Sequence, residues 1–149
     1  MEDLPQGLRY TVDHVWVRND GQSLFTIGLT EPAQLLLGNV LNIDLPNEGD
    51  SFDAGDDCAV IESIKTSNDI FMPLSGDVIA VNDELIAEPE LINNAPYGEG
   101  WLLQILISNP SELDDLLDAQ SYNTMLENYV ENENDENEDY EEEDSDDYE

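Results

Sequence analysis

The segment Val60-Ile61-Glu62-Ser63-Ile64-Lys65-Thr66-Ser67-Asn68-Asp69-Ile70 decides how the middle of this chain folds. Apolar residues towards its two ends are typical of paired β-strands, and the polar residues at its centre are typical of a tight turn. The pattern therefore predicts a β-hairpin with Lys65 at its tip. Taken alone, an exposed lysine in a turn is an ordinary solvated charge.

The composition of the chain gives Lys65 more weight. The 149 residues include 37 acidic side chains and three basic ones, which are Arg9, Arg18 and Lys65. The sequence thus contains a single lysine, and that lysine stands in the predicted turn. A swinging-arm cofactor needs a side chain that forms a stable amide on a rigid, protruding turn. The position of Lys65 therefore favours covalent attachment over a merely solvated charge.

The formal net charge of −34 argues against several classes of partner. A surface this negative repels phosphate backbones and anionic lipid headgroups, so we expect no binding to nucleic acid or to membranes. No apolar run has the length of a membrane-spanning helix. The N-terminal residues resemble neither a signal peptide nor a transit peptide. We therefore expect a cytoplasmic protein, and we expect it to be a monomer.

The composition divides the chain into a domain and a tail. Residues 131–149 hold 13 of the 37 acids and no aliphatic side chain. Such a segment buries too little apolar area to offset the entropy of ordering it, so we expect a disordered acidic tail. Residues 1–130 form the domain, which carries 24 acids against three bases.

Strand patterns dominate the domain. Residues 10–18 alternate in a way that places His14 and Trp16 on the same face of a strand, and a turn over 19–22 leads into a returning strand over 24–28. Further strands are predicted over 40–45, 57–64, 70–73, 77–81 and 101–107.

Helical signals are fewer. Residues 31–37 predict a short helix that ends at Gly38. Ser111 predicts the N-cap of a helix near the C-terminus, where Leu113, Leu116 and Leu117 follow at helical spacing. The expected fold class is mainly β, with a short internal helix and C-terminal helices.

The sequence offers little for catalysis or metal binding. Its one cysteine, Cys58, lies in an apolar run and is typical of a core residue. Cys58 and the one histidine, His14, are far apart in sequence and give no obvious nucleophile–base pair. The acidic pair Asp56-Asp57 lacks the ligand spacing of a calcium loop. We therefore expect no catalytic residues and no metal site.

Motifs on both sides of Lys65 resemble one known family. Glu62-Ser63-Ile64-Lys65 resembles the Glu-Ser-Val-Lys lipoylation motif of the H proteins of the glycine cleavage system, which are relatives of the lipoyl and biotinyl carrier domains. The resemblance covers about residues 8–130, and many motifs in register are far more specific than one short motif. The other matching runs are residues 14–17, 27–38, 73–82, 89–93, 96–102 and 110–113.

The resemblance implies a barrel-sandwich hybrid fold and a lipoyl group (lipoate) attached covalently to Lys65. The implied protein shuttles an aminomethyl group from a glycine decarboxylase that uses pyridoxal phosphate to an aminomethyltransferase that uses tetrahydrofolate. Dihydrolipoamide dehydrogenase then takes up the electrons, and a separate enzyme attaches the lipoate. The implied protein is a carrier and not an enzyme, because the cofactors supply the difficult chemistry.

The resemblance also suggests which residues contact the arm or its recognition partners. These candidates are Glu62, Ser63, Asp69 and His14. Val15 departs from the family, which usually has a glutamate at this position next to the histidine. The departure removes a carboxylate that would suit an arm ending in an amine, and Asp69 is the remaining candidate for that role.

Two other interpretations remain open from the sequence. A lipoyl storage or relay protein would have the same fold and would donate lipoate to 2-oxoacid dehydrogenases. A binding module without lipoate would use the acidic surface alone. A biotin carrier is disfavoured, because Ile64-Lys65-Thr66 lacks the Met-Lys-Met setting.

Overall fold

The computed structural model describes residues 7–128. The predicted disordered tail over residues 131–149, and residues 1–6 and 129–130 of the predicted domain, lie outside this range. The elements are β1 (Arg9–Tyr10), β2 (Val15–Gly21), β3 (Leu24–Leu29), α1 (Glu31–Leu37), β4 (Val40–Asp44), β5 (Ser51–Phe52), β6 (Asp57–Ser63), β7 (Ser67–Phe71), β8 (Gly76–Val81), α2 (Glu84–Ala87), α3 (Leu91–Asn94), β9 (Leu103–Ile107), the 3-10 helix η1 (Pro110–Asp115) and a helix over 119–128.

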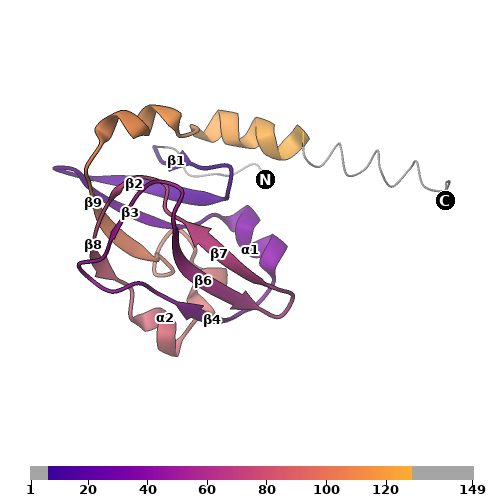
Figure 1. Ribbon diagram of the computed structural model, residues 1–149. Helices are drawn as coiled ribbons and strands as arrows, with labels where there is room; N and C mark the ends of the chain where they lie inside the picture. Colours follow the sequence, from indigo (N-terminus) through magenta and orange to yellow (C-terminus); the bar gives the residue numbers. More distant parts are fainter. Residues whose placement is uncertain (1–6, 129–149) are drawn as a thin grey trace, which may run out of the picture.

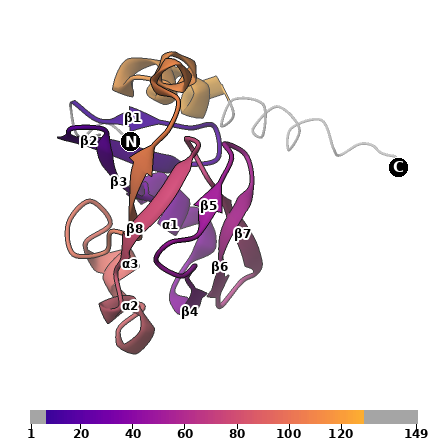
Figure 2. The same ribbon diagram turned by 60° about the vertical axis from the view of Figure 1, so that its left-hand side comes forward.

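The described strands form two antiparallel sheets. The larger sheet has the order β1-β2-β3-β9-β8-β5, and the smaller sheet has the order β4-β6-β7. These sheets do not close into a single barrel, and the main apolar core draws side chains from both of them. The C-terminal segment lies over β1 and β2 at one end, and α2 lies at the other end (Figures 1 and 2). The mainly β prediction is therefore confirmed.

The first hairpin differs from the simple alternation predicted over residues 10–18. The chain leaves β1 at Tyr10, turns, and enters β2 at Val15, so that Tyr10 pairs with Trp16. Val15, Trp16 and Val17 are all buried, because the main core covers one face of β2 and the C-terminal helix covers the other. A strand that is buried on both faces cannot show an apolar–polar alternation.

The short internal helix forms where it was predicted. The side chain of Thr30 caps α1 by accepting a hydrogen bond from the Ala33 N–H at 3.2 Å. The helix ends at Gly38, which has a φ of +76° and whose N–H donates to the Gln34 carbonyl at 2.9 Å. A positive φ is readily adopted by glycine, so the sequence signal at Gly38 and the helix end coincide.

The C-terminal segment is helical, but its predicted N-cap is wrong. Ser111 lies inside η1, whose N-cap position is Asn109 and has no side-chain capping bond. The Ser111 hydroxyl instead donates to the Asn109 side chain at 2.7 Å. A proline stands at the start of η1. Residues 119–128 then form a helix that packs Tyr122 and Leu126 against β1 and β2.

Candidate functional site

Lys65 lies in the turn between β6 and β7, as the sequence predicts. The turn spans residues 64–66, and Lys65 is exposed there. The hairpin extends away from the C-terminal helices, which leaves its tip open to solvent (Figure 1). No ion pair to Lys65 is present among residues 7–128, where Arg18 pairs with Asp20 at 2.9 Å.

The buried side chain of Ser63 holds the turn from inside. Its Oγ accepts hydrogen bonds from the backbone N–H groups of Lys65 and Thr66, each at 3.2 Å. The Ser63 N–H donates to the Thr66 carbonyl at 2.8 Å, which closes the turn across its base. Ser63 is 8% exposed. It therefore fixes the backbone beneath the lysine, whereas its neighbour Glu62 points to solvent.

A loop that follows α1 supports the turn from outside. The Asn39 carbonyl accepts a hydrogen bond from the Ile64 N–H at 3.0 Å. A Cβ placed on Gly38 would lie 3.4 Å from Cγ1 of Ile64 and 3.4 Å from Cε of Lys65. The aliphatic stem of the lysine thus runs close to the end of α1, and its amine extends beyond.

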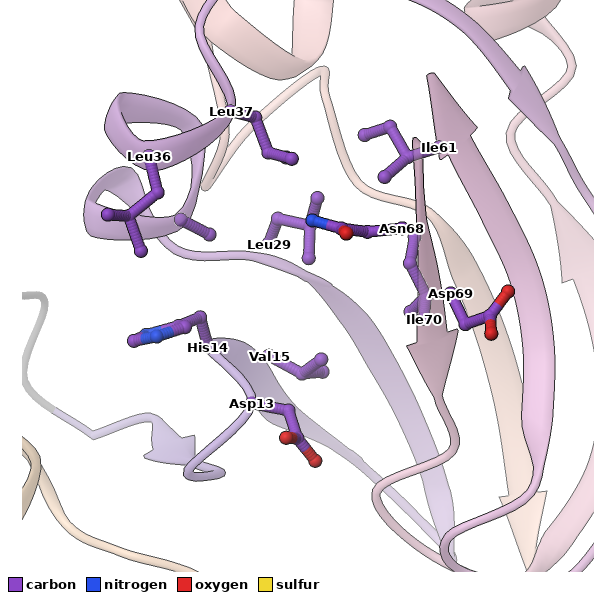
Figure 3. Close-up of a pocket in the computed structure, with 11 residues that line it drawn as sticks. Asp13, His14, Val15, Leu29, Leu36, Leu37, Ile61, Asn68, Asp69 and Ile70 are labelled. Atoms are coloured by element: carbon purple, nitrogen blue, oxygen red, sulfur yellow. The ribbon is translucent and has the colours of Figure 1, made fainter. Parts of the chain in front are cut away.

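A cleft beside the hairpin separates α1 from β7 and has a volume of about 110 Å³. Apolar side chains make up most of its wall, and polar groups from the chain before β2 and from β7 complete it (Figure 3). An open groove of about 490 Å³ shares Asp13, His14, Asn68 and Asp69 with this cleft. We call the two together the α1–β7 cleft. Its lining residues include Leu29, Leu36, Leu37, Ile61 and Ile70.

His14 lines the cleft but faces the C-terminal helix. Its Nδ1 lies 2.6 Å from the hydroxyl of Tyr122, and its ring points away from Asn68 (Figure 3). Burial lowers the pKa of His14 below its ordinary value of 6.5, and the nearby Asp13 opposes that shift. The backbone φ of His14 is +71°, a conformation that histidine adopts more readily than most residues. The ring is thus neutral at physiological pH and tied into the fold.

The carboxylates of the cleft lie at its rim. Asp69 comes from β7, and Figure 3 shows its carboxylate pointing away from α1, whereas the amide of Asn68 points across the cleft towards Leu29. Asp13 also lines the rim. Neither Asn68 nor Asp13 was predicted from the sequence. The alternation of side chains along a strand could have predicted the position of Asn68, because Asn68 lies on the same face of β7 as the buried Ile70.

Val15 and Cys58 serve the core. Val15 is 1% exposed, so the family's glutamate position is here part of the cleft's apolar wall. Cys58 is also buried, and burial raises the pKa of its thiol to about 12. A thiol with so high a pKa is an inert packing group at neutral pH, which agrees with the sequence interpretation.

These features fit a lysine-linked acyl arm. Lys65 is exposed on a turn that four backbone or hydroxyl hydrogen bonds hold in place, and an apolar cleft with polar edges lies between the adjacent β7 and α1. An amide-linked chain with an apolar body and a polar end matches such a cleft in chemical character. A β-hairpin that presents a single lysine beside an amphipathic cleft suits a carrier domain.

Comparison with known proteins agrees. A family model described as Glycine cleavage H-protein matches residues 8–129. The glycine cleavage system H protein of Pectobacterium carotovorum is 50% identical to the chain, and the alignment covers 85% of this chain and 98% of the relative. The glycine cleavage system H protein of Photorhabdus laumondii is 51% identical, and the alignment covers 85% of this chain and 97% of the relative. The crystal structure of a glycine cleavage system H protein from Mycobacterium marinum superposes with a TM-score of 0.72 at 30% identity, covering 82% of this chain and 98% of that one.

The chain belongs to the glycine cleavage H-protein family. Its role is that of a carrier in the glycine cleavage system. No helix within residues 7–128 has the length and apolar character needed to cross a bilayer.

Proposed function

We propose that Lys65 carries the lipoyl group of this carrier. The observation that supports the proposal most strongly is the position of the chain's single lysine at the exposed tip of a braced hairpin. When bound, the lipoyl group supplies a disulfide that takes up an aminomethyl group and two electrons. The protein's own residues orient the lysine, keep its amine accessible and provide the cleft beside it.

The partners follow from this role. Glycine decarboxylase loads the carrier, aminomethyltransferase unloads it, dihydrolipoamide dehydrogenase reoxidises it, and a lipoate-attaching enzyme modifies Lys65 beforehand. Exposed apolar side chains near the turn support docking of these enzymes, since Ile64 is 60% exposed and Leu36 is 52% exposed. Contiguous exposed apolar groups are typical of protein–protein contact sites.

The α1–β7 cleft is the proposed resting place of the loaded arm. Apolar side chains form most of its wall, and the negative charges of Asp13 and Asp69 at its rim attract a cationic amine through space, since the Asp69 carboxylate itself points away from α1. Asn68 adds a hydrogen-bonding group inside the cleft. His14 contributes its neutral ring to the wall of the cleft. Ser63 holds the turn in shape, and Glu62 is a recognition contact for the partner enzymes.

Substitution of the two rim carboxylates tests this use of the cleft. Exchanging Asp13 and Asp69 for asparagine keeps the side-chain size and removes two negative charges. We expect the double variant to be lipoylated normally and to release ammonia from the loaded carrier faster when aminomethyltransferase is absent. An unchanged rate of ammonia release would show that the rim carboxylates do not hold the cargo.

Reconstitution with purified glycine decarboxylase tests the role of Lys65. Arginine at this position keeps the positive charge but cannot form the lipoyl amide, so Lys65→Arg should abolish glycine–CO2 exchange while the melting temperature stays the same. Thr66→Ala is the matched control, because the Thr66 side chain is exposed and makes only a 3.5 Å contact with the Ser67 carbonyl. Exchange activity in the arginine variant would overturn the proposal.

A further inference from the structure

The side chain of Asn93, in α3, bonds to both ends of a loop that is distant in sequence. Its Oδ1 accepts from the Val40 N–H at 2.8 Å. Its Nδ2 donates to the Gly38 carbonyl at 2.9 Å and to the Gln34 side chain at 3.1 Å. One amide group thus holds the end of α1 and the start of β4 at a fixed separation. We call residues 38–40 the bracing loop.

The bracing loop in turn contacts the lysine turn. Between the two residues that Asn93 holds lies Asn39, whose carbonyl accepts from the Ile64 N–H. Val40 is also the register partner of Ser63, the residue that fixes the turn from inside. The chain of contacts therefore runs from α3 through the bracing loop to the backbone beside Lys65.

We propose that Asn93 is a positioning residue for the modification of Lys65. By fixing the bracing loop, Asn93 holds the lysine turn in the orientation that the lipoate-attaching enzyme binds. This inference rests on the proposed lipoylation of Lys65. Asn93 itself contacts neither the lysine nor the arm and acts only through the bracing loop.

The chemistry of the amide explains why asparagine stands at this position. The bracing loop presents one donor, the Val40 N–H, and one acceptor, the Gly38 carbonyl, and an amide satisfies both. An ionised aspartate has two acceptors and no donor, so it would keep the contact with Val40 and face the Gly38 carbonyl with a like partial charge. Alanine would lose both contacts.

Loss of these contacts should change binding more than turnover. Ser63 still closes the turn in an Asn93 variant, so the turn forms but samples more orientations. An enzyme that binds only a fraction of these orientations has an apparent affinity reduced by that fraction. If the competent fraction falls to about one tenth, KM for the carrier rises about ten-fold while kcat changes less than two-fold.

Asn82 provides a matched control for general destabilisation. Its Nδ2 donates to the carbonyls of Glu99 and Trp101, both at 2.8 Å, and its Oδ1 accepts from the Glu84 N–H at 3.3 Å. The side chain is therefore used in the same way as that of Asn93, but none of these partners belongs to the bracing loop or to the lysine turn. Asn82→Asp should destabilise the fold without loosening that turn.

The experiment uses the full chain with Asn93→Asp, Asn93→Ala and Asn82→Asp. Steady-state lipoylation by a purified lipoate-attaching enzyme gives KM and kcat, and amide hydrogen exchange of Ile64 reports the contact with Asn39 directly. We expect both Asn93 variants to raise KM about ten-fold, with Ile64 exchanging about ten-fold faster, and Asn82→Asp to change neither value beyond about two-fold.

Three results would overturn the inference. Unchanged Ile64 exchange and KM in the Asn93 variants would show that the bracing loop does not orient the turn. Equal changes in Asn82→Asp would show that general loss of stability is the cause. Failure of the wild-type carrier to accept lipoate at all would remove the proposed function itself, which the variants alone cannot do.

Discussion

The hydroxyl of Tyr122 links the C-terminal helix to the α1–β7 cleft, and its removal has a predictable cost. The oxygen lies 2.6 Å from Nδ1 of His14 and 2.8 Å from Oγ1 of Thr30, the N-cap of α1. The Tyr122 side chain is fully buried, and its ring stacks on Tyr10 with a centroid distance of 4.8 Å. Tyr122→Phe keeps the stacked ring and removes both hydrogen bonds.

The expected loss of stability depends on which hydrogen bonds Thr30 and His14 can still make in the variant. A buried polar group left without its hydrogen bond costs about 1–3 kcal/mol. Thr30 is buried but still accepts from the Ala33 N–H, and the half-buried His14 ring can turn to water, so each cost falls towards the lower limit. We expect a total loss of about 2 kcal/mol, which corresponds to a fall in melting temperature of roughly 5–10 °C for a domain of this size.

Urea and thermal unfolding of the wild type and the variant measure this loss. Burial raises the pKa of Tyr122 to about 12, whereas a tyrosine in the unfolded chain titrates near 10, so the difference should be constant from neutral pH to about pH 9. Tyr97→Phe is the control, because the half-buried Tyr97 hydroxyl accepts one hydrogen bond, from the Glu31 N–H at 2.9 Å. A loss in Tyr122→Phe below about 0.5 kcal/mol, or equal to that in Tyr97→Phe, would refute the bridging role.

Two further predictions concern charge. Burial lowers the pKa of His14, so the folded chain binds fewer protons at this residue than the unfolded chain does. The neutral His14 therefore contributes to the free energy of unfolding above about pH 6.5, and this contribution is lost as pH falls through the folded pKa. His14→Asn should remove that part of the pH dependence in urea titrations between pH 5 and 7.5, and parallel profiles would refute it. The 24 acids of residues 1–130 repel one another over a Debye length of about 30 Å at 0.01 M salt but only about 3 Å at 1 M. The melting temperature should therefore climb with added sodium chloride, also when the tail is deleted, and a flat series would show that the acids are neutralised in another way.

Local signals in the sequence account for the elements that were predicted correctly. The internal helix is defined by Gly38 at its end, and the lysine hairpin is defined by apolar runs on both sides of Lys65. The polar residues 67–69 were predicted as turn, but they form the first part of β7, so the turn is shorter than predicted. The exposure of Lys65 follows equally from its polar neighbours. Each of these features depends on residues within a few positions of one another, which is the range over which sequence patterns are informative.

The features that were missed depend on contacts between distant segments. Val40 and Asn93 are separated by 53 positions, and His14 and Tyr122 by 108. No local pattern records which side chain reaches which backbone group across such separations. The same reason explains β2, whose second buried face exists only because the C-terminal helix folds back over Trp16.

The most direct test of the account is the intact mass of the protein purified from its own cells, followed by mapping of the modified peptide. We predict a mass increase equal to one lipoyl group, confined to the peptide that contains Lys65. The Lys65→Arg protein should show no increase. A native carrier that is fully active in the glycine cleavage system while Lys65 remains unmodified would contradict the central claim.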